Sequence, residues 1–192
     1  MKKQNTVLHL FNRSTSFELI ITVLCIKITM SMLRTVLTGL ILLINITINA
    51  QKIPSMKMDE VVAYFSKTND TVYVINFWAT FCKPCVAELP YVQNIALKYK
   101  TSKVKLLLVS VDLKSYYPDK ITTFAKKKNI RADIAWLNET NADYFCPMID
   151  TAWSGSIPAT LFVNSKTGYK YFFEGEMKAV EFEEALLKAI KN

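Results

Sequence analysis

Apolar and polar positions follow two different periods along residues 51–192. Short runs of apolar and β-branched residues alternate with segments in which apolar residues recur every three or four positions. The short runs predict strands at 71–78, 104–111, 134–137, 159–164 and 169–174. The helical spacing predicts helices at 59–67, with Asp59 as its N-cap, and at 86–100, 118–128, 144–152 and 181–190. This mixture indicates an α/β domain.

The order of these segments predicts how the strands pair. A strand, a helix and a strand occur in that order between residues 71 and 111, which favours a right-handed crossover and a parallel pair. The segment 104–111 is apolar almost throughout, as in a strand covered on both faces. The turn residues Ser165–Gly168 favour an antiparallel hairpin. We therefore expect a central mixed β-sheet, with a parallel βαβ half and an antiparallel hairpin, flanked by helices on both faces.

The N-terminal part of the chain has a different pattern. Residues 18–48 are mostly apolar, with Lys27 and Arg34 as interruptions. A basic residue followed by an apolar stretch and then by the small residue Ala50 is typical of a secretory signal peptide cleaved before Gln51. The alternative is an uncleaved membrane anchor, although the apolar run from Val36 to Ile48 is shorter than the roughly 20 residues of a membrane span.

This pattern divides the chain into two parts. Residues 1–50 form an N-terminal extension with a signal peptide or anchor, and residues 51–192 form the folded domain. A polar stretch as long as residues 1–18 is unusual before a signal, which raises the hypothesis that Met30 or Met32 is the true start. Export would place the domain in the periplasm or cell envelope.

The charge of the chain excludes some classes of function. The 192 residues carry 24 Lys or Arg and 16 Asp or Glu, but residues 51–192 carry only 19 and 15 of these. Such a mildly basic domain does not fit a nucleic-acid-binding protein. The run Lys126–Lys128 fits the solvated end of a helix, with an anion-binding patch as the alternative. Four glycines and no Gly-rich loop leave no phosphate-binding motif.

The candidate chemistry lies in Cys82-Lys83-Pro84-Cys85, directly after the strand 71–78. Two thiols at this spacing suit reversible disulfide formation. At a helix N-terminus, Cys82 would face free backbone N–H groups, which favour its thiolate, so Cys82 is the expected nucleophile. Lys83 and Pro84 would help to lower its pKa and to fix the first turn. Cys85, one turn inside the helix, is the expected resolving thiol.

Other uses of two such cysteines fit the sequence less well. A zinc site needs two more ligands, and the single histidine, His9, lies in the N-terminal extension. Cys146 is one candidate ligand, and no fourth is evident. Haem attachment needs a histidine after the second cysteine, where this chain has Val86. We therefore expect neither a metal nor a cofactor. Cys146 fits a buried apolar position, with a regulatory thiol as the alternative.

Four groups of residues together carry a resemblance to a known family. They are Asn76–Thr80, Cys82–Cys85, Glu88 with Pro90, and Ser156–Thr160 ahead of a strand. On these motifs, residues 56–190 resemble the thioredoxin-like superfamily, and within it the exported thiol-disulfide oxidoreductases of the TlpA and ResA type. The resemblance implies a thioredoxin-like fold.

The resemblance also implies roles for residues outside the cysteine pair. Pro158 is expected to be cis and to lie against the disulfide, so that Ile157 and Pro158 form a substrate platform; an ordinary loop proline is the alternative. Trp78 is a third candidate for substrate contact, with core packing as the alternative. Glu88 is a candidate proton shuttle to the resolving thiol, or an acidic residue stabilised by the helix dipole. Asn76 stands where thioredoxins have a buried Asp, and it cannot titrate.

The expected function follows from the cysteine pair and the resemblance. We expect an exported reductase of disulfides in client proteins, which serves redox homeostasis or cytochrome c maturation and receives electrons from a membrane thiol relay. The alternatives are an oxidant that introduces disulfides and a thioredoxin-like module that binds clients without turnover. We expect a monomer that contacts the membrane only through its N-terminal segment.

Overall fold

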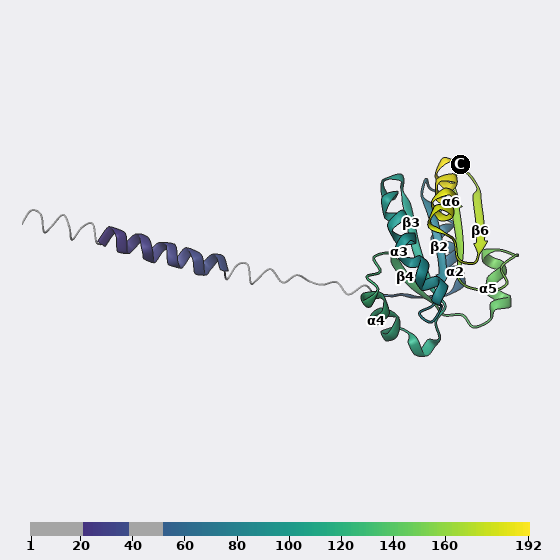
Figure 1. Ribbon diagram of the computed structural model, residues 1–192, viewed down its shortest axis with the longest axis horizontal. Helices are drawn as coiled ribbons and strands as arrows, with labels where there is room; N and C mark the ends of the chain where they lie inside the picture. Colours follow the sequence, from purple (N-terminus) through teal and green to yellow (C-terminus); the bar gives the residue numbers. More distant parts are fainter. Residues whose placement is uncertain (1–20, 39–51) are drawn as a thin grey trace, which may run out of the picture. The chain divides into compact units, whose positions relative to one another are not determined.

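The computed structural model describes residues 21–38 and 52–192. The chain divides into two units, Met1–Ala50 and Gln51–Asn192. The second unit contains the sheet and the helices that surround it, shown in Figure 1.

A six-stranded mixed sheet forms the centre of the second unit, in the order β1-β4-β3-β2-β5-β6. Strands β1, β4, β3 and β2 are parallel, and β5 and β6 are antiparallel to their neighbours. The mixed sheet and the hairpin predicted from the sequence are confirmed. The strands are β1 (Ser55–Met56), β2 (Val72–Trp78), β3 (Val104–Ser110), β4 (Asp133–Leu137), β5 (Ala159–Asn164) and β6 (Tyr169–Glu174).

Helices cover both faces of this sheet. Residues of α3, α4 and α6 share one buried cluster with the sheet, and residues of α2 and α5 share the other. In Figure 1, α3 and α6 lie in front of the sheet and α2 lies behind it. The α-helices are α2 (Met58–Phe65), α3 (Lys83–Lys98), α4 (Asp119–Lys127), α5 (Ala142–Ile149) and α6 (Ala179–Lys191), with 3-10 turns at Lys100–Ser102 and Lys114–Tyr116.

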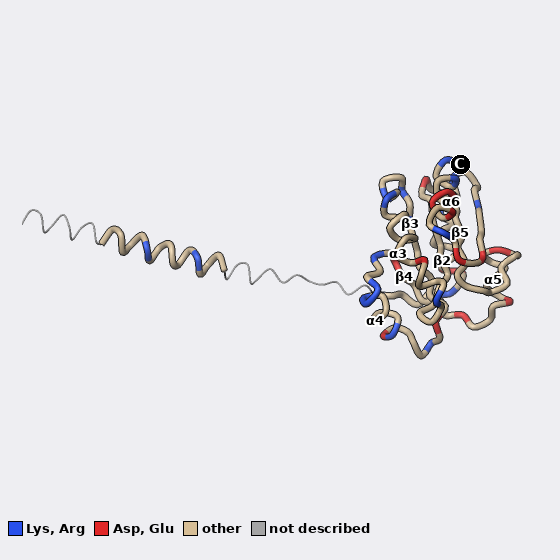
Figure 2. The backbone as a smooth tube through the Cα atoms, in the orientation of Figure 1, with Lys and Arg blue, Asp and Glu red and all other residues tan. Residues whose placement is uncertain are grey.

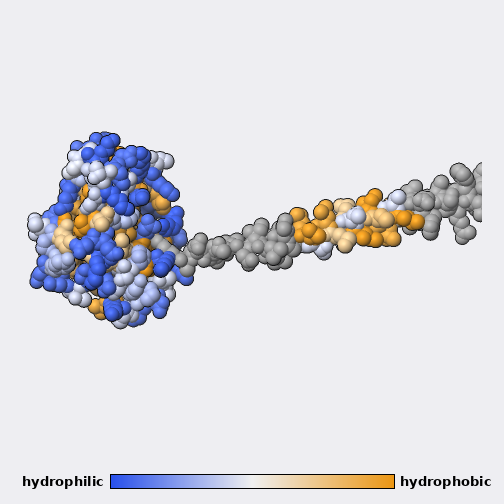
Figure 3. Space-filling view, turned by 180° about the vertical axis from the view of Figure 1, so that it is seen from behind, coloured by the Kyte–Doolittle hydropathy of each residue, from blue (hydrophilic) through white to orange (hydrophobic). Residues whose placement is uncertain are grey.

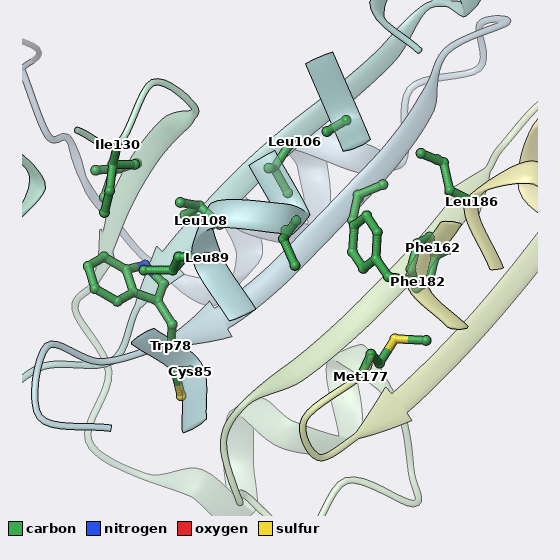
Figure 4. Close-up of a cluster of buried hydrophobic side chains, with 14 of the residues drawn as sticks. Trp78, Cys85, Leu89, Leu106, Leu108, Ile130, Phe162, Met177, Phe182 and Leu186 are labelled. Carbon is green, nitrogen blue, oxygen red and sulfur yellow. The ribbon is translucent and has the colours of Figure 1, made fainter. Parts of the chain in front are cut away.

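Alternation along the central strands supplies both clusters. Every residue of β2 is buried, and its odd and even positions point to opposite faces of the sheet. Tyr73, Ile75 and Phe77 belong to the cluster under α2 and α5, whereas Val72, Val74 and Trp78 belong to the cluster under α3 and α6. Figure 4 shows the second cluster, in which Phe162 of β5 lies beside Phe182 of α6. Asn76 is the polar exception on this face.

The structure corrects some of the predicted elements. The short strand β1 is absent from the sequence-based prediction, because it has only two residues. The sequence predicted Asp59 as the N-cap of α2, and this prediction is wrong. That position is Lys57, whose backbone N–H donates a hydrogen bond to Glu60 Oε2 at 2.7 Å. Helix α3 begins at Lys83 with Cys82 as its N-cap, as expected for the cysteine pair, although the apolar pattern alone placed the helix only from residue 86.

In the first unit, one helix (Ile21–Thr38) is described. It has 18 residues and a mean hydropathy of 1.5, which make it long and apolar enough to cross a membrane by length and composition. Figure 3 shows its mostly hydrophobic surface. The helix includes Lys27 and Arg34, and the predicted cleavage point at Ala50 lies outside the described residues. Its position near the N-terminus is consistent with a signal sequence or an anchor.

Charges in the second unit are mixed rather than segregated. In Figure 2, acidic and basic positions are interspersed along the backbone of this unit. Four ion pairs are formed in the part of the chain that the structure describes, all between exposed or partly exposed side chains. Such pairs contribute little to stability, because solvent screens exposed charges. The stability of the domain therefore rests mainly on the two apolar clusters.

Candidate functional site

The candidate site lies where β2 ends and α3 begins. Cys82 is the N-cap residue of α3, and Cys82 and Cys85 form a disulfide with a Cα–Cα distance of 5.3 Å. The backbone N–H of Cys85 donates a hydrogen bond to Cys82 Sγ at 3.3 Å. The first turn of α3 therefore directs an N–H group at the Cys82 sulfur. This geometry stabilises a thiolate on Cys82 when the pair is reduced.

The two cysteines differ in their access to solvent. Cys82 is 8% exposed, whereas Cys85 is fully buried. Figure 4 places Cys85 at the end of the apolar cluster, beside Trp78. Phe81, the residue before Cys82, is an apolar side chain that is 62% exposed. Cys82 is therefore the less buried of the two cysteines, and an exposed aromatic ring precedes it.

Lys83 and Pro84 occupy the first turn of α3, between the two cysteines. Both residues are exposed, and Pro84 is placed where its missing N–H leaves no helical hydrogen bond unmade. Lys83 directly follows Cys82 in the sequence, and a positive charge near Cys82 favours its thiolate.

A loop from the far side of the sheet reaches the disulfide. The carbonyl oxygen of Ile157 lies 3.7 Å from Cys82 Sγ. Because the disulfide sulfur carries no hydrogen, this is a contact in the oxidised protein, and the Cys82 thiol could donate there after reduction. The Ile157–Pro158 peptide bond is cis, as the resemblance implies. The structure thus brings Ile157 and Cys82 together from positions 75 residues apart.

Glu88 is buried one helical turn beyond Cys85. Its side chain has no exposed surface. Burial raises the pKa of Glu88 to about 7, against the opposing effect of two hydrogen bonds. Asn76 Nδ2 donates to Glu88 Oε1 at 2.7 Å, and the backbone N–H of Met177 donates to Oε2 at 3.2 Å. Residues at positions i and i+3 of a helix are neighbours, so this carboxyl group lies on the same side of α3 as Cys85.

A small polar group within the core holds Glu88. Asn76 of β2 and Thr160 of β5 are cross-strand partners, and Asn76 Nδ2 also donates to Thr160 Oγ1 at 3.0 Å. Asn76 Oδ1 has no hydrogen-bond partner within the described residues. Asn76 and Thr160 both lie in motifs that carry the family resemblance, but neither was expected to hold Glu88. No local pattern signals this contact, because it depends on the register of β2 against β5.

Trp78 lies in the core and not on the surface. Its side chain is fully buried and packs against Phe124, with ring centroids 5.7 Å apart. The position therefore favours the packing alternative over substrate contact. Trp78 Nε1 lacks a hydrogen-bond partner in the described part of the chain.

Asp112 is a site residue that the sequence analysis missed. It follows β3 and is buried, and its carboxylate accepts hydrogen bonds from Thr80 N–H and Thr80 Oγ1. Ser110 Oγ donates to the same carboxylate at 2.8 Å. Asp112 therefore ties the end of β3 to the segment that leads into α3. Its place just beyond a buried parallel strand was the available signal, since functional residues of α/β sheets gather at that edge.

The two remaining cysteines are separate from the disulfide. Cys25 is exposed on the N-terminal helix, and Cys146 is a buried thiol in α5. Burial raises the pKa of Cys146, with further contributions from Glu174 and Asp143. Residues 21–38 and 52–192 contain no group of three or more His, Cys, Asp or Glu that could hold a metal ion.

A family model supports the interpretation of this geometry. The Redoxin model matches residues 48–173, which is more than half of the chain and includes the disulfide, Glu88 and Pro158. The chain belongs to the Redoxin family. Curated relatives of this Redoxin-family protein include thiol-disulfide oxidoreductases named ResA. The ResA of Oceanobacillus iheyensis is 38% identical over 58 residues, which cover 30% of each chain.

A longer match is to the ResA of Geobacillus kaustophilus. It is 27% identical over 112 residues, which cover 58% of this chain and 59% of the relative. The Redoxin-family chain therefore matches less than two thirds of the length of these relatives.

Solved structures show the same fold. A thioredoxin-related protein from Neisseria meningitidis serogroup B has a TM-score of 0.56 at 24% identity, over 65% of this chain and 88% of the other. A thiol:disulfide interchange protein from Chlorobium tepidum has a TM-score of 0.51 at 18% identity, over 63% and 81% of the two chains. The Redoxin-family domain thus has the thioredoxin-like fold that the sequence predicts.

Proposed function

We propose that the domain is a thiol-disulfide oxidoreductase that reduces disulfides in client proteins through Cys82 and Cys85. The observation that carries the proposal is the unequal pair at the start of α3. Cys82 is 8% exposed and accepts a backbone hydrogen bond, whereas Cys85 has no exposed surface. An attacking thiol must be reached by its substrate, and a resolving thiol needs to reach only its neighbour.

The reaction begins from the reduced pair. The Cys82 thiolate attacks one sulfur of a client disulfide, so a Cys82–client S–S bond forms and the client S–S bond breaks. The released client thiolate takes a proton from water. The Cys85 thiolate then attacks Cys82 Sγ, which forms the disulfide seen in the structure and releases the second client thiol. Two electrons pass from the domain to the client, and a dithiol donor must return them.

Glu88 is the proposed acceptor of the Cys85 proton in the second step. A general base works best when its pKa lies near the operating pH, and the pKa of Glu88 is raised to about 7. A carboxylate that keeps its ordinary acidity would be a weaker base. The hydrogen bonds from Asn76 and Met177 support this role, because they fix both carboxyl oxygens on the helix that carries Cys85.

Ile157 and Pro158 are the proposed platform for the client. The Ile157 carbonyl is in contact with Cys82 Sγ, so a chain segment that reaches this sulfur must pass beside Ile157. Extended segments pair readily with a free backbone edge. The exposed ring of Phe81 supplies apolar surface on the other side of Cys82.

The proposed location is outside the cytoplasm, in the periplasm or cell envelope. The apolar helix Ile21–Thr38 supports either a signal peptide or an anchor ahead of the domain. In an oxidising compartment a reductase needs a supply of electrons, so a membrane thiol relay is the proposed donor. Disulfide-containing exported proteins are the proposed clients, with cytochrome c apoprotein as a candidate.

Single cysteine variants test this mechanism. With insulin as the protein disulfide, full-length Cys85→Ser in detergent should form a stable mixed disulfide through Cys82, visible as a mass shift. Cys82→Ser should form none, and both variants should lose at least about a hundredfold in turnover, since each removes an obligatory sulfur. Cys146→Ser is the matched control and should retain wild-type turnover. Trapping through Cys85 in the Cys82→Ser variant would contradict the assigned order.

A further inference from the structure

One carboxylate holds the loop that leads to the proposed platform. Glu174, the last residue of β6, lies opposite the segment Ser154–Ser156. Its Oε2 accepts the Ser154 backbone N–H at 3.1 Å, and its Oε1 accepts the Ser156 backbone N–H at 2.9 Å and the Ser154 hydroxyl at 2.5 Å. Three donors from two residues of the loop, Ser154 and Ser156, thus converge on a single side chain.

The charge of Glu174 makes these bonds stronger than ordinary ones. Partial burial raises the pKa of Glu174, but the hydrogen bonds from Ser154 and Ser156 outweigh it and leave the pKa below its ordinary value. The carboxylate is therefore ionised at neutral pH. Hydrogen bonds to an ionised acceptor are roughly twice as strong as neutral ones.

Two more contacts fix the same loop from either side. Trp153 Nε1 donates to the Ser156 carbonyl at 2.9 Å, and the Gly175 N–H donates to the Pro158 carbonyl at 2.8 Å. Between these contacts, Gly155 has a φ of +91°, a backbone conformation that residues other than glycine rarely adopt. The loop therefore has little conformational freedom while Glu174 holds it.

The position of this loop determines the position of Ile157. Ile157 follows Ser156 directly, and its carbonyl oxygen lies 3.7 Å from Cys82 Sγ. The backbone N–H of Ile157 has no hydrogen-bond partner within the described residues, so it is available to a bound chain. Within the described residues, Glu174 makes no hydrogen bond to either sulfur of the disulfide. Any effect of Glu174 on the surroundings of Cys82 therefore passes through the loop.

We propose that Glu174 is a positioning residue for client recognition, which holds Ser154–Ser156 so that Ile157 is presented to an extended segment of a disulfide-bonded protein. The proposal rests on the proposed function, because it assigns a recognition role within that reaction. A preordered loop lowers the entropy lost when a client binds. Small disulfides that need only the Cys82 sulfur gain nothing from it.

The test compares a protein disulfide with a small one. Full-length wild type, Glu174→Gln and Glu174→Asp are assayed with insulin and with dithiobis(nitrobenzoate). Glu174→Gln should raise KM for insulin about fivefold, the factor for loss of one hydrogen bond, with kcat unchanged. The rate with dithiobis(nitrobenzoate) should not change. Glu174→Asp keeps the charge and should recover part of the loss, and Glu184→Gln, an exposed carboxylate of α6, should match wild type.

Amide hydrogen exchange provides a readout that does not depend on activity. The N–H groups of Ser154 and Ser156 should exchange at least about tenfold faster in Glu174→Gln, because they lose their acceptor. Unchanged exchange would show that Glu174 does not hold the loop and would overturn the inference.

The remaining outcomes separate this inference from the proposed function. Faster exchange with an unchanged insulin KM would overturn the recognition role alone. An equal loss with insulin and dithiobis(nitrobenzoate) would also overturn it, because the effect would then lie at the sulfur. Wild type that reacts with dithiobis(nitrobenzoate) but never reduces insulin would instead refute the proposed function, and the inference with it.

Discussion

Glu88 is a carboxyl group within an apolar core, and its ionisation therefore affects stability. Burial raises the pKa of Glu88 to about 7 in the folded protein, whereas in the unfolded chain the pKa lies near its ordinary value of 4.5. The folded state thus holds the proton longer. The free energy of unfolding should fall as pH rises from about 4.5 to about 7, by up to about 3 kcal/mol.

Urea unfolding of the oxidised full-length protein across this pH range measures the effect. Wild type should lose stability as the pH rises, and Glu88→Gln should lack that component, since it has no group to titrate. The slope is the readout, because the amide also changes the hydrogen bonds with Asn76 and Met177. Glu184→Gln, exposed on α6, should keep the wild-type slope. Parallel slopes for wild type and Glu88→Gln would refute the buried-carboxyl account.

At the scale of single residues, local motifs were predictable and distant partners were not. The roles proposed for Cys82 and Cys85 follow from their separation of three positions in the sequence and from their place at a helix N-terminus. The partners of Glu88 come from β2 and β5, and Asn76 and Thr160 lie 84 positions apart in the chain. Such a contact depends on strand register, which the apolar pattern alone does not determine. Glu174 and Ser154 were missed for the same reason.

At the scale of elements, Asp112 joins β3 to the start of α3. Its buried carboxylate accepts hydrogen bonds from Thr80 and Ser110, so Asp112→Asn would present an amide donor to groups that are themselves donors. The variant should lower the free energy of unfolding by about 1–3 kcal/mol, the cost of an unsatisfied buried group. Chemical denaturation of the full chain measures it.

Asp133→Asn is the matched control for this variant. Asp133 is exposed at the start of β4, where a substitution should change stability by no more than about 0.5 kcal/mol. Equal stability for Asp112→Asn and Asp133→Asn would show that the Thr80 contacts do not anchor α3.

Long, strongly patterned elements were predictable, and short ones were not. The hairpin strands β5 and β6 begin and end at the predicted residues, because a turn motif separates two apolar runs. The two-residue strand β1 pairs with Trp136 and Leu137 of β4. It has too few residues to show any period, and its existence depends on the partner strand. The N-cap of α2 was misplaced for a related reason, since several polar residues precede that helix.

At the scale of the whole molecule, the fold class was predictable from the sequence, because the order of strands and helices limits the possible topologies. A parallel crossover followed by a hairpin leaves few possible arrangements of the five predicted strands in one sheet. The same logic places the ends of β2 and β3 at one edge of the sheet, where the disulfide lies. The direction of electron flow is not encoded in this way, because it depends on the relative stability of thiolate and disulfide at one site.

The reduction potential of the Cys82–Cys85 pair tests the proposed reductase most directly. Full-length protein would be equilibrated with dithiothreitol or glutathione buffers, and the oxidised fraction read from alkylation of the peptide that bears both cysteines. The account predicts a potential at or below about −230 mV, in the range of thioredoxin and glutaredoxins. A potential near about −120 mV would indicate an oxidant, and a pair that never titrates would indicate a binding module; either result would contradict the reductase.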